Sequence, residues 1–112
     1  MFVFKQINIG IAEFDGRLKV KRGSLLPLEV NKTASDITVK RLGKEKQLAF
    51  NRQLREGVDG DWQLLYPDFD VVYYIPGTKV PFTVEKYKES LGRPYNRVNL
   101  YICKTEDYYE GK

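Results

Sequence analysis

The stretch LEVNKTASDITVK, residues 28–40, contains the end of a strand and the start of a helix. Leu28 and Val30 flank a polar residue, and this alternation is typical of a strand with one buried face. Thr33 is followed three residues later by Asp36, which is the capping-box pattern of a helix start, although Ser35 is an equally suitable cap. The stretch therefore predicts a strand that leads within a few residues into an amphipathic helix.

A strand pair is predicted before this stretch. Isoleucines at every second position mark residues 7–11 as a strand, and the Asp-Gly pair at 15–16 is a favoured two-residue hairpin turn. Residues 17–22 alternate apolar with basic side chains, so the second strand has one apolar edge and one basic edge. The Gly-Ser pair at 23–24 predicts a bulge, and Pro27 favours the edge of the sheet.

The predicted helix has an apolar stripe at mixed three- and four-residue spacing. Gly43 lies inside the helix and weakens it, so that it either breaks there and resumes or continues to about Arg55. The stripe consists of Val39, Leu42, Ala49 and Phe50.

Further β-prone runs occupy residues 62–66, 71–75 and 98–103. A short helix is predicted over residues 84–91, with Thr83 as its cap and Gly92 as its end. From Thr105 onward the chain is polar. We therefore expect one domain over residues 1–104 and a polar, flexible tail over 105–112.

The order strand, strand, helix, strand, turn, strand resembles that of ubiquitin-like β-grasp domains. LEV at 28–30 with its Ser/Thr-capped helix is similar to the family's second strand and helix, QLLY at 63–66 to its third strand, and NLYI at 99–102 to its last. The resemblance covers roughly residues 5–104. It implies an α+β, β-grasp fold in which a mixed sheet of four to five strands packs on one main helix, with a short second helix. The ending Glu-Gly-Lys at 110–112 lacks the Gly-Gly pair of a conjugated modifier, so the resemblance implies an embedded domain.

Two neighbouring β-grasp families are also similar. The run YPDFDV at 66–71 resembles in outline the acidic motif of PB1 domains, although Pro67 and Phe69 depart from its usual residues. The basic second strand is similar to the strand with which Ras-binding domains pair with a GTPase. Both resemblances imply docking by charge.

Catalytic residue types are scarce. The chain has one cysteine, Cys103, and no histidine, the commonest general base and metal ligand. Acids such as Asp68 and Asp70 fall in turns, where aspartate is common for backbone reasons. We therefore expect no enzyme, no metal site and no cofactor.

Composition indicates a folded, intracellular domain, cytoplasmic or nuclear. Apolar residues make up 42% of the chain, and no apolar run approaches the ~20 residues of a membrane span. Net charge is +4, with the basic excess in residues 1–56 and a slight acidic excess in 57–112. This asymmetry suits an acidic partner or head-to-tail pairing of two copies.

Two partner-binding surfaces are predicted. If Ile7, Leu18, Val20 and Leu64 face the helix, then the opposite face of the sheet presents Leu65, Tyr101 and Asn99, with Phe14 near by; the alternative is that Tyr108 and Tyr109 cover this face. The second surface is the basic strand, which alternatively only protects a sheet edge from aggregation. Its cations are Arg17, Lys19, Lys21 and Arg22. We expect a protein partner, and this basic surface suits an acidic one.

Nucleic-acid binding is the least favoured interpretation. The sequence pI of about 9.1 and the eight tyrosines are compatible with it. However, most aromatic residues lie in apolar phase or in turns, and the acidic second half would repel phosphate.

Overall fold

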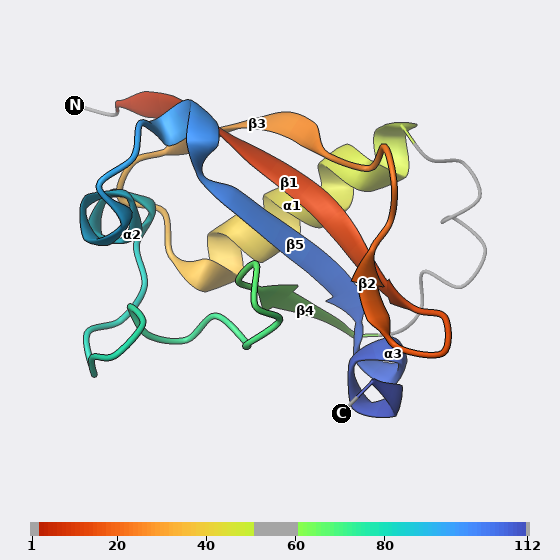
Figure 1. The fold of residues 1–112 in the computed structure, drawn as a ribbon. Coiled ribbons are helices and arrows are strands. Elements are labelled where there is room, and N and C mark those ends of the chain that lie inside the picture. Colours follow the sequence, from red (N-terminus) through yellow and green to blue (C-terminus); the bar gives the residue numbers. More distant parts are fainter. Residues whose placement is uncertain (1–2, 51–60, 112) are drawn as a thin grey trace.

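The computed structural model describes residues 3–50 and 61–111 as a mixed sheet with helices on both faces (Figure 1). The elements in chain order are β1 (Phe4–Phe14), β2 (Leu18–Val20), β3 (Leu26–Asn31), α1 (Asp36–Phe50), β4 (Trp62–Leu65), α2 (Val84–Leu91), the 3-10 helix η2 (Tyr95–Arg97), β5 (Asn99–Lys104) and α3 (Thr105–Glu110). The predicted α+β class, the mixed sheet on one main helix and the short helix 84–91 are confirmed. Among the described residues, no helix has the length and apolar character needed to cross a bilayer.

The long strand β1 organises the sheet, whose order is β2-β1-β5-β4. Its first half pairs antiparallel with β3 and its last residues pair antiparallel with β2, so β2 and β3 share one edge of β1. On its other edge β1 pairs in parallel with β5, which brings Ile9 beside Leu100 and Ile11 beside Ile102. Figure 1 shows α1 crossing behind the sheet and α3 in front of it; we call these the inner and outer faces.

A bulge separates β2 from β3 at the predicted Gly-Ser pair. Ser24 is buried; its Oγ accepts a hydrogen bond from the Ile11 amide at 2.9 Å and donates to the Lys21 carbonyl at 2.7 Å. Because the chain leaves the ladder here, side chains before and after the bulge lie on opposite faces. Leu18 and Val20 therefore lie on the outer face, where they are the cross-strand neighbours of Phe14 and Ala12. The prediction that Leu18 and Val20 pack on the helix is wrong.

The helix α1 is continuous through Gly43, and Gly43 lies on its buried side. A Cβ at this glycine would lie 2.8 Å from Ile9 Cγ1, so its absence allows the helix to approach β1 closely. One turn further, Gln47 is fully buried and its amide nitrogen donates to the carbonyls of Ile9 and Ser24, both at 2.8 Å. The buried face is thus Val39, Gly43 and Gln47.

The predicted apolar stripe is correct only in its first half. Val39 is buried and Leu42 half-buried, whereas Ala49 and Phe50 are exposed. The face of α1 that turns toward the sheet is therefore set by Val39, Gly43 and Gln47, which are spaced four residues apart, and not by the spacing of the large apolar residues. The predicted extension to about Arg55 and the turn over 57–61 lie largely outside the described residues.

The β-prone run at 71–75 does not form a regular strand. It is held by single bridges, Leu65 with Val71 and Tyr74 with Pro81, and by the bond from the Val72 amide to the Leu64 carbonyl at 2.9 Å. In the turn just before this run, Phe69 has a left-handed φ of 70°, so the chain changes direction there. The segment leads into an aromatic cluster of Tyr66, Phe82 and Tyr87.

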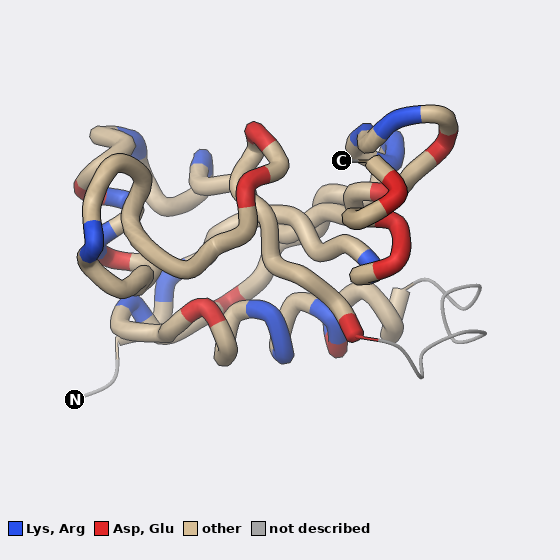
Figure 2. Tube along the Cα trace, turned by 90° about the horizontal axis from the view of Figure 1, so that it is seen from below, with Lys and Arg blue, Asp and Glu red and all other residues tan. Residues whose placement is uncertain are grey.

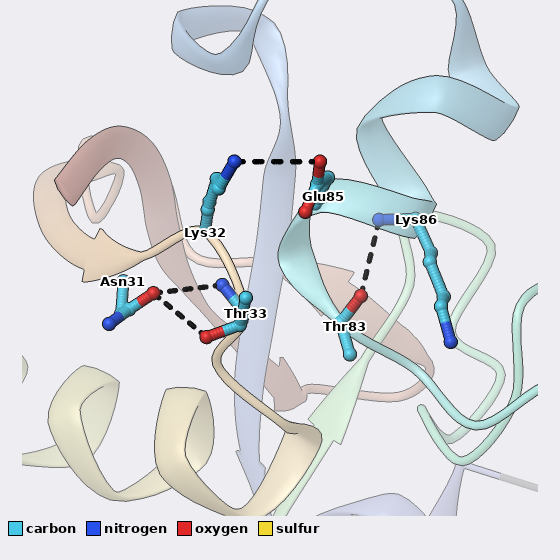
Figure 3. Close-up of polar contacts among 6 residues, drawn as sticks. All are labelled: Asn31, Lys32, Thr33, Thr83, Glu85 and Lys86. Carbon is cyan, nitrogen blue, oxygen red and sulfur yellow. Dashed lines mark hydrogen bonds and ion pairs between the residues drawn. The ribbon is translucent and has the colours of Figure 1, made fainter. Parts of the chain in front are cut away.

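The start of α2 is tied to the connection between β3 and α1 (Figure 3). Thr83 caps the helix by accepting from the Lys86 amide at 3.2 Å, and Glu85 lies 3.8 Å from the Lys32 ammonium. The Glu85 amide also donates to the Lys32 carbonyl at 2.8 Å. In the same connection Asn31 Oδ1 accepts from the Thr33 amide and hydroxyl. Two helices distant in the sequence are thereby held together.

Residues 105–110 form the helix α3, and the expectation of a flexible tail from Thr105 is wrong for this segment. Tyr108 is buried against the outer face, and Gly111 lies over Leu18 of β2, where a Cβ would lie 2.2 Å from Leu18 Cγ. A polar-looking segment is thus held by one aromatic side chain and one close contact.

Candidate protein-binding surfaces

The apolar patch predicted around Leu65 does not exist as an exposed surface. Leu65 points away from α1, as predicted, but it is 0% exposed. With Ala12, Cys103 and Tyr108 it forms a second small core on the outer face. The physical reason is α3, which covers this end of the sheet by inserting Tyr108; the alternative of a covering C-terminal segment describes the structure.

Tyr101 and Asn99 lie on the outer face but are also engaged. Gly10 leaves room for the Tyr101 ring, since a Cβ there would lie 2.8 Å from two ring carbons, and burial raises the pKa of Tyr101. Asn99 Oδ1 accepts from the side-chain amide of Asn8 at 2.9 Å, which also donates to the Asn96 carbonyl. Both side chains are half-buried.

The basic hairpin, defined as Arg17, Lys19, Lys21 and Arg22, lies on β2 and the turns beside it, at an edge of the sheet. Lys19 forms an ion pair with Asp15 at 2.8 Å, and the hydrogen bond from Lys19 lowers the pKa of Asp15. The other three cations have no ion-pair partner in the described part of the chain. Phe14 faces Leu18 across the hairpin and is half-buried.

Acidic residues lie close to this hairpin. Glu13 is directly opposite Lys19 in the ladder, and Figure 2 shows acidic and basic residues mixed at the end of the molecule where the C-terminus lies. The positive potential at the hairpin is therefore weaker than that of four isolated cations. The positive charge that is not ion-paired within the described residues belongs to Arg17, Lys21 and Arg22.

Further basic residues lie on α1, whose blue segments are visible in Figure 2. Beside it, a hollow of about 260 Å³ between α1 and β4 is lined by Ile37, Lys40, Arg41, Lys44, Asp61 and Trp62. The Trp62 Nε1 donor has no hydrogen-bond partner within the described part of the chain, but it is fully buried. Asp61 and the ion pair of Arg41 with Glu45 at 3.8 Å offset part of the positive charge, and no further observation at this hollow points to a ligand.

A third surface was missed by sequence reasoning. A groove of about 440 Å³ separates α3 from the segment after β4, and it is lined by Gln63, Asp70, Val71, Tyr73, Tyr108 and Tyr109. Its signal in the sequence is two adjacent tyrosine pairs, 73–74 and 108–109, with acids beside them. Only the docking of α3 brings the two pairs together.

Cys103 is a core residue of the outer face. It is fully buried, its Sγ donates to the Lys104 carbonyl at 3.4 Å, and burial raises the pKa of the thiol to about 12. Such a thiol is a poor nucleophile near neutral pH, because the thiolate is the reactive form. Within residues 3–50 and 61–111, no three cysteine or carboxylate side chains gather as metal ligands.

Comparisons with known proteins find no matching family model, no significantly similar curated protein and no significantly similar solved structure.

Proposed function

We propose that this chain is a ubiquitin-like β-grasp domain that acts as a non-catalytic protein-interaction module. The parallel β1–β5 pair at the centre of the sheet, the hairpin on one side of it and β4 on the other support the β-grasp assignment. The crossing of α1 over the inner face, between β3 and β4, fits the same architecture (Figure 1).

The basic hairpin is the proposed contact for an acidic segment of a partner protein. The carrying observation is that Arg17, Lys21 and Arg22 have no ion-pair partner in the described residues, while they lie together at a sheet edge. Unpaired charges of one sign steer an oppositely charged partner and fix its orientation more than they add affinity. Leu65 is no longer part of the proposed contact, since it is core.

Charge reversal tests this proposal. The double substitution Lys21→Glu and Arg22→Glu should weaken binding of partners retained from the native source about tenfold or more, and raising salt from 50 to 500 mM should weaken wild-type binding strongly. Lys86→Glu is the matched control, because Lys86 is an exposed cation on α2 that contributes only its backbone amide to the cap. Equal retention by the double variant and the control would refute the basic hairpin as the contact.

A second candidate is strand pairing of the Ras-binding kind. It is favoured because β2 is the edge of the described sheet. The Lys21 amide bonds to Ile11 of β1, so by alternation the Val20 amide points away from β1 and is available to a partner strand. Val20→Pro removes this donor on the open side, where proline is tolerated. Loss of binding in a folded Val20→Pro protein would support pairing, and unchanged binding would leave side-chain charge as the determinant.

A further inference from the structure

The groove between α3 and the segment after β4 has fixed walls. On one side Tyr108 anchors α3 in the outer-face core. On the other side the bridge between Leu65 and Val71 and the bond from the Tyr66 amide to the Asp70 carbonyl hold the turn against β4. The groove is therefore preformed, which lowers the entropy loss of binding an extended ligand.

Exposed tyrosines line this groove. Tyr73 is 60% exposed and Tyr109 is 68% exposed, although both belong to a residue type that usually buries its ring. A second hollow of about 220 Å³ continues the groove past Tyr74 and Pro76 and shares Asp70, Val71 and Tyr73 with it. Tyr73 thus borders both hollows, which we together call the channel.

The charge of the channel is of one sign. Among residues 3–50 and 61–111, its charged lining residues are Asp68 and Asp70, and no Lys or Arg of this part of the chain lines either hollow. Neither carboxylate forms an ion pair within the described residues; Asp68 Oδ1 only accepts from the Asp70 amide at 3.1 Å, as in a turn. The acids of α3 beside Tyr108 and Tyr109 add to the negative potential.

We infer that this channel binds an extended, arginine-bearing segment of a partner protein. Aromatic faces attract cations, and a guanidinium stacks on a tyrosine ring while it bonds to a carboxylate. In the bound state Tyr73 and Tyr109 hold the guanidinium and the stem of the arginine, and Asp70 is its counter-ion. The channel and the basic hairpin lie on either side of α3, whose end packs on Leu18 of β2, and the two surfaces attract ligands of opposite charge.

The test uses a fluorescein-labelled peptide with three arginines spaced by Gly-Ser, and a matched peptide in which citrulline replaces each arginine. Citrulline keeps the size of arginine and removes its charge. Fluorescence anisotropy should show at least tenfold tighter binding of the arginine peptide. Tyr73→Ala and Asp70→Asn should each weaken that binding about three- to tenfold, because a cation–π contact or a charge-assisted bond contributes on this scale.

Matched controls separate the channel from general surface effects. Phe4 is 57% exposed at the other end of the sheet, and Glu89 is an exposed acid on α2, so Phe4→Ala and Glu89→Gln should change the affinity less than twofold. Circular dichroism checks that each variant is folded, and Tyr109→Ala replaces Tyr73→Ala if the latter unfolds. Equal affinity for the two peptides, or equal affinity of channel and control variants, would overturn the inference.

Self-association is the remaining outcome. If sedimentation shows a dimer that Tyr73→Ala and Asp70→Asn dissociate, and the arginine peptide competes with it no better than the citrulline peptide, then the occupant is a surface of a second copy. That result would overturn the assignment to a partner segment. A monomer that binds the arginine peptide supports it.

Discussion

The two faces of the sheet are buried by different means. On the inner face α1, a helix of fifteen residues, lies close to β1 at Gly43 and covers a core that extends to α2 and the aromatic cluster. On the outer face α3, a helix of six residues, covers only the end of the sheet and inserts Tyr108 among three other buried side chains.

The inner face holds the larger core, whereas the outer face carries the proposed binding groove. On the inner face α1 covers the centre of the sheet and leaves a hollow beside β4, whereas the outer face leaves a channel beside α3 where two tyrosines are exposed. A short helix held by one aromatic side chain creates a groove that a complete cover would fill. The same helix also converts a predicted binding patch into core.

Leu65→Ala is expected to cause the largest loss of stability among the outer-face substitutions. Leu65 and the inner-face residue Leu100 are both 0% exposed, so Leu65→Ala and Leu100→Ala should each lower the free energy of unfolding by about 2–4 kcal/mol. Urea unfolding measures both. A loss below about 1 kcal/mol for Leu65→Ala alone would mean that α3 does not seal the outer face in solution.

Tyr108→Ala should loosen α3 and expose Cys103. Removal of the ring should cost about 2 kcal/mol or less, since the short helix can undock without global unfolding. The rate of thiol alkylation at pH 8 should rise at least tenfold, because the Cys103 thiol would regain solvent and a lower pKa. Tyr109→Ala is the matched control, since Tyr109 is exposed; equal alkylation rates in the two variants would contradict the docking role of Tyr108.

Gly43→Ala tests the close approach of α1. Alanine favours a helix by about 1 kcal/mol over glycine, but a methyl group 2.8 Å from Ile9 Cγ1 forces overpacking that costs about 1–3 kcal/mol. We expect a net loss of about 1 kcal/mol in urea unfolding. Adding Ile9→Val to Gly43→Ala should recover part of this loss, and a net gain from Gly43→Ala alone would show that the helix can shift away.

Alkaline pH should lower stability with different onsets for the buried thiol and the buried tyrosines. Burial raises the pKa of Cys103 on the outer face to about 12, and the pKa of Tyr66 and Tyr87 above the ordinary value of 10.0. Groups with raised pKa values stay protonated in the folded state while the unfolded chain ionises, so stability is retained below pH 9 and falls as pH rises above it. Cys103→Ser should remove the part of the fall that begins near pH 9, and Tyr66→Phe a part that begins near pH 10. A stability curve that is flat to pH 11 in the wild type would contradict both assignments.

Sequence reasoning succeeded where local pattern and tertiary environment agree. The isoleucines of β1, the Thr83 cap and the α+β class were all predictable, because period-two alternation and capping depend on neighbours in the chain. It predicted the bulge at residues 23–24 but not its consequence, that Leu18 and Val20 lie on the outer face, because this depends on the hydrogen bond between Ser24 and Ile11 of β1. It also missed α3, because the sequence of residues 105–110 contains no pattern that distinguishes a docked helix from a frayed chain end.

The amino-acid order by itself determined the succession of strands and helices, the apolar interior of β1 and β5, and the uneven charge of the two halves. Only the tertiary structure decided which face of each helix is buried, that Leu65 is covered, and that Tyr73 and Tyr109, 36 residues apart, line one channel. The physical reason is that periodicity reports contacts within one element, whereas a glycine contact, a buried amide or a docked aromatic ring depends on partners that are distant in the chain.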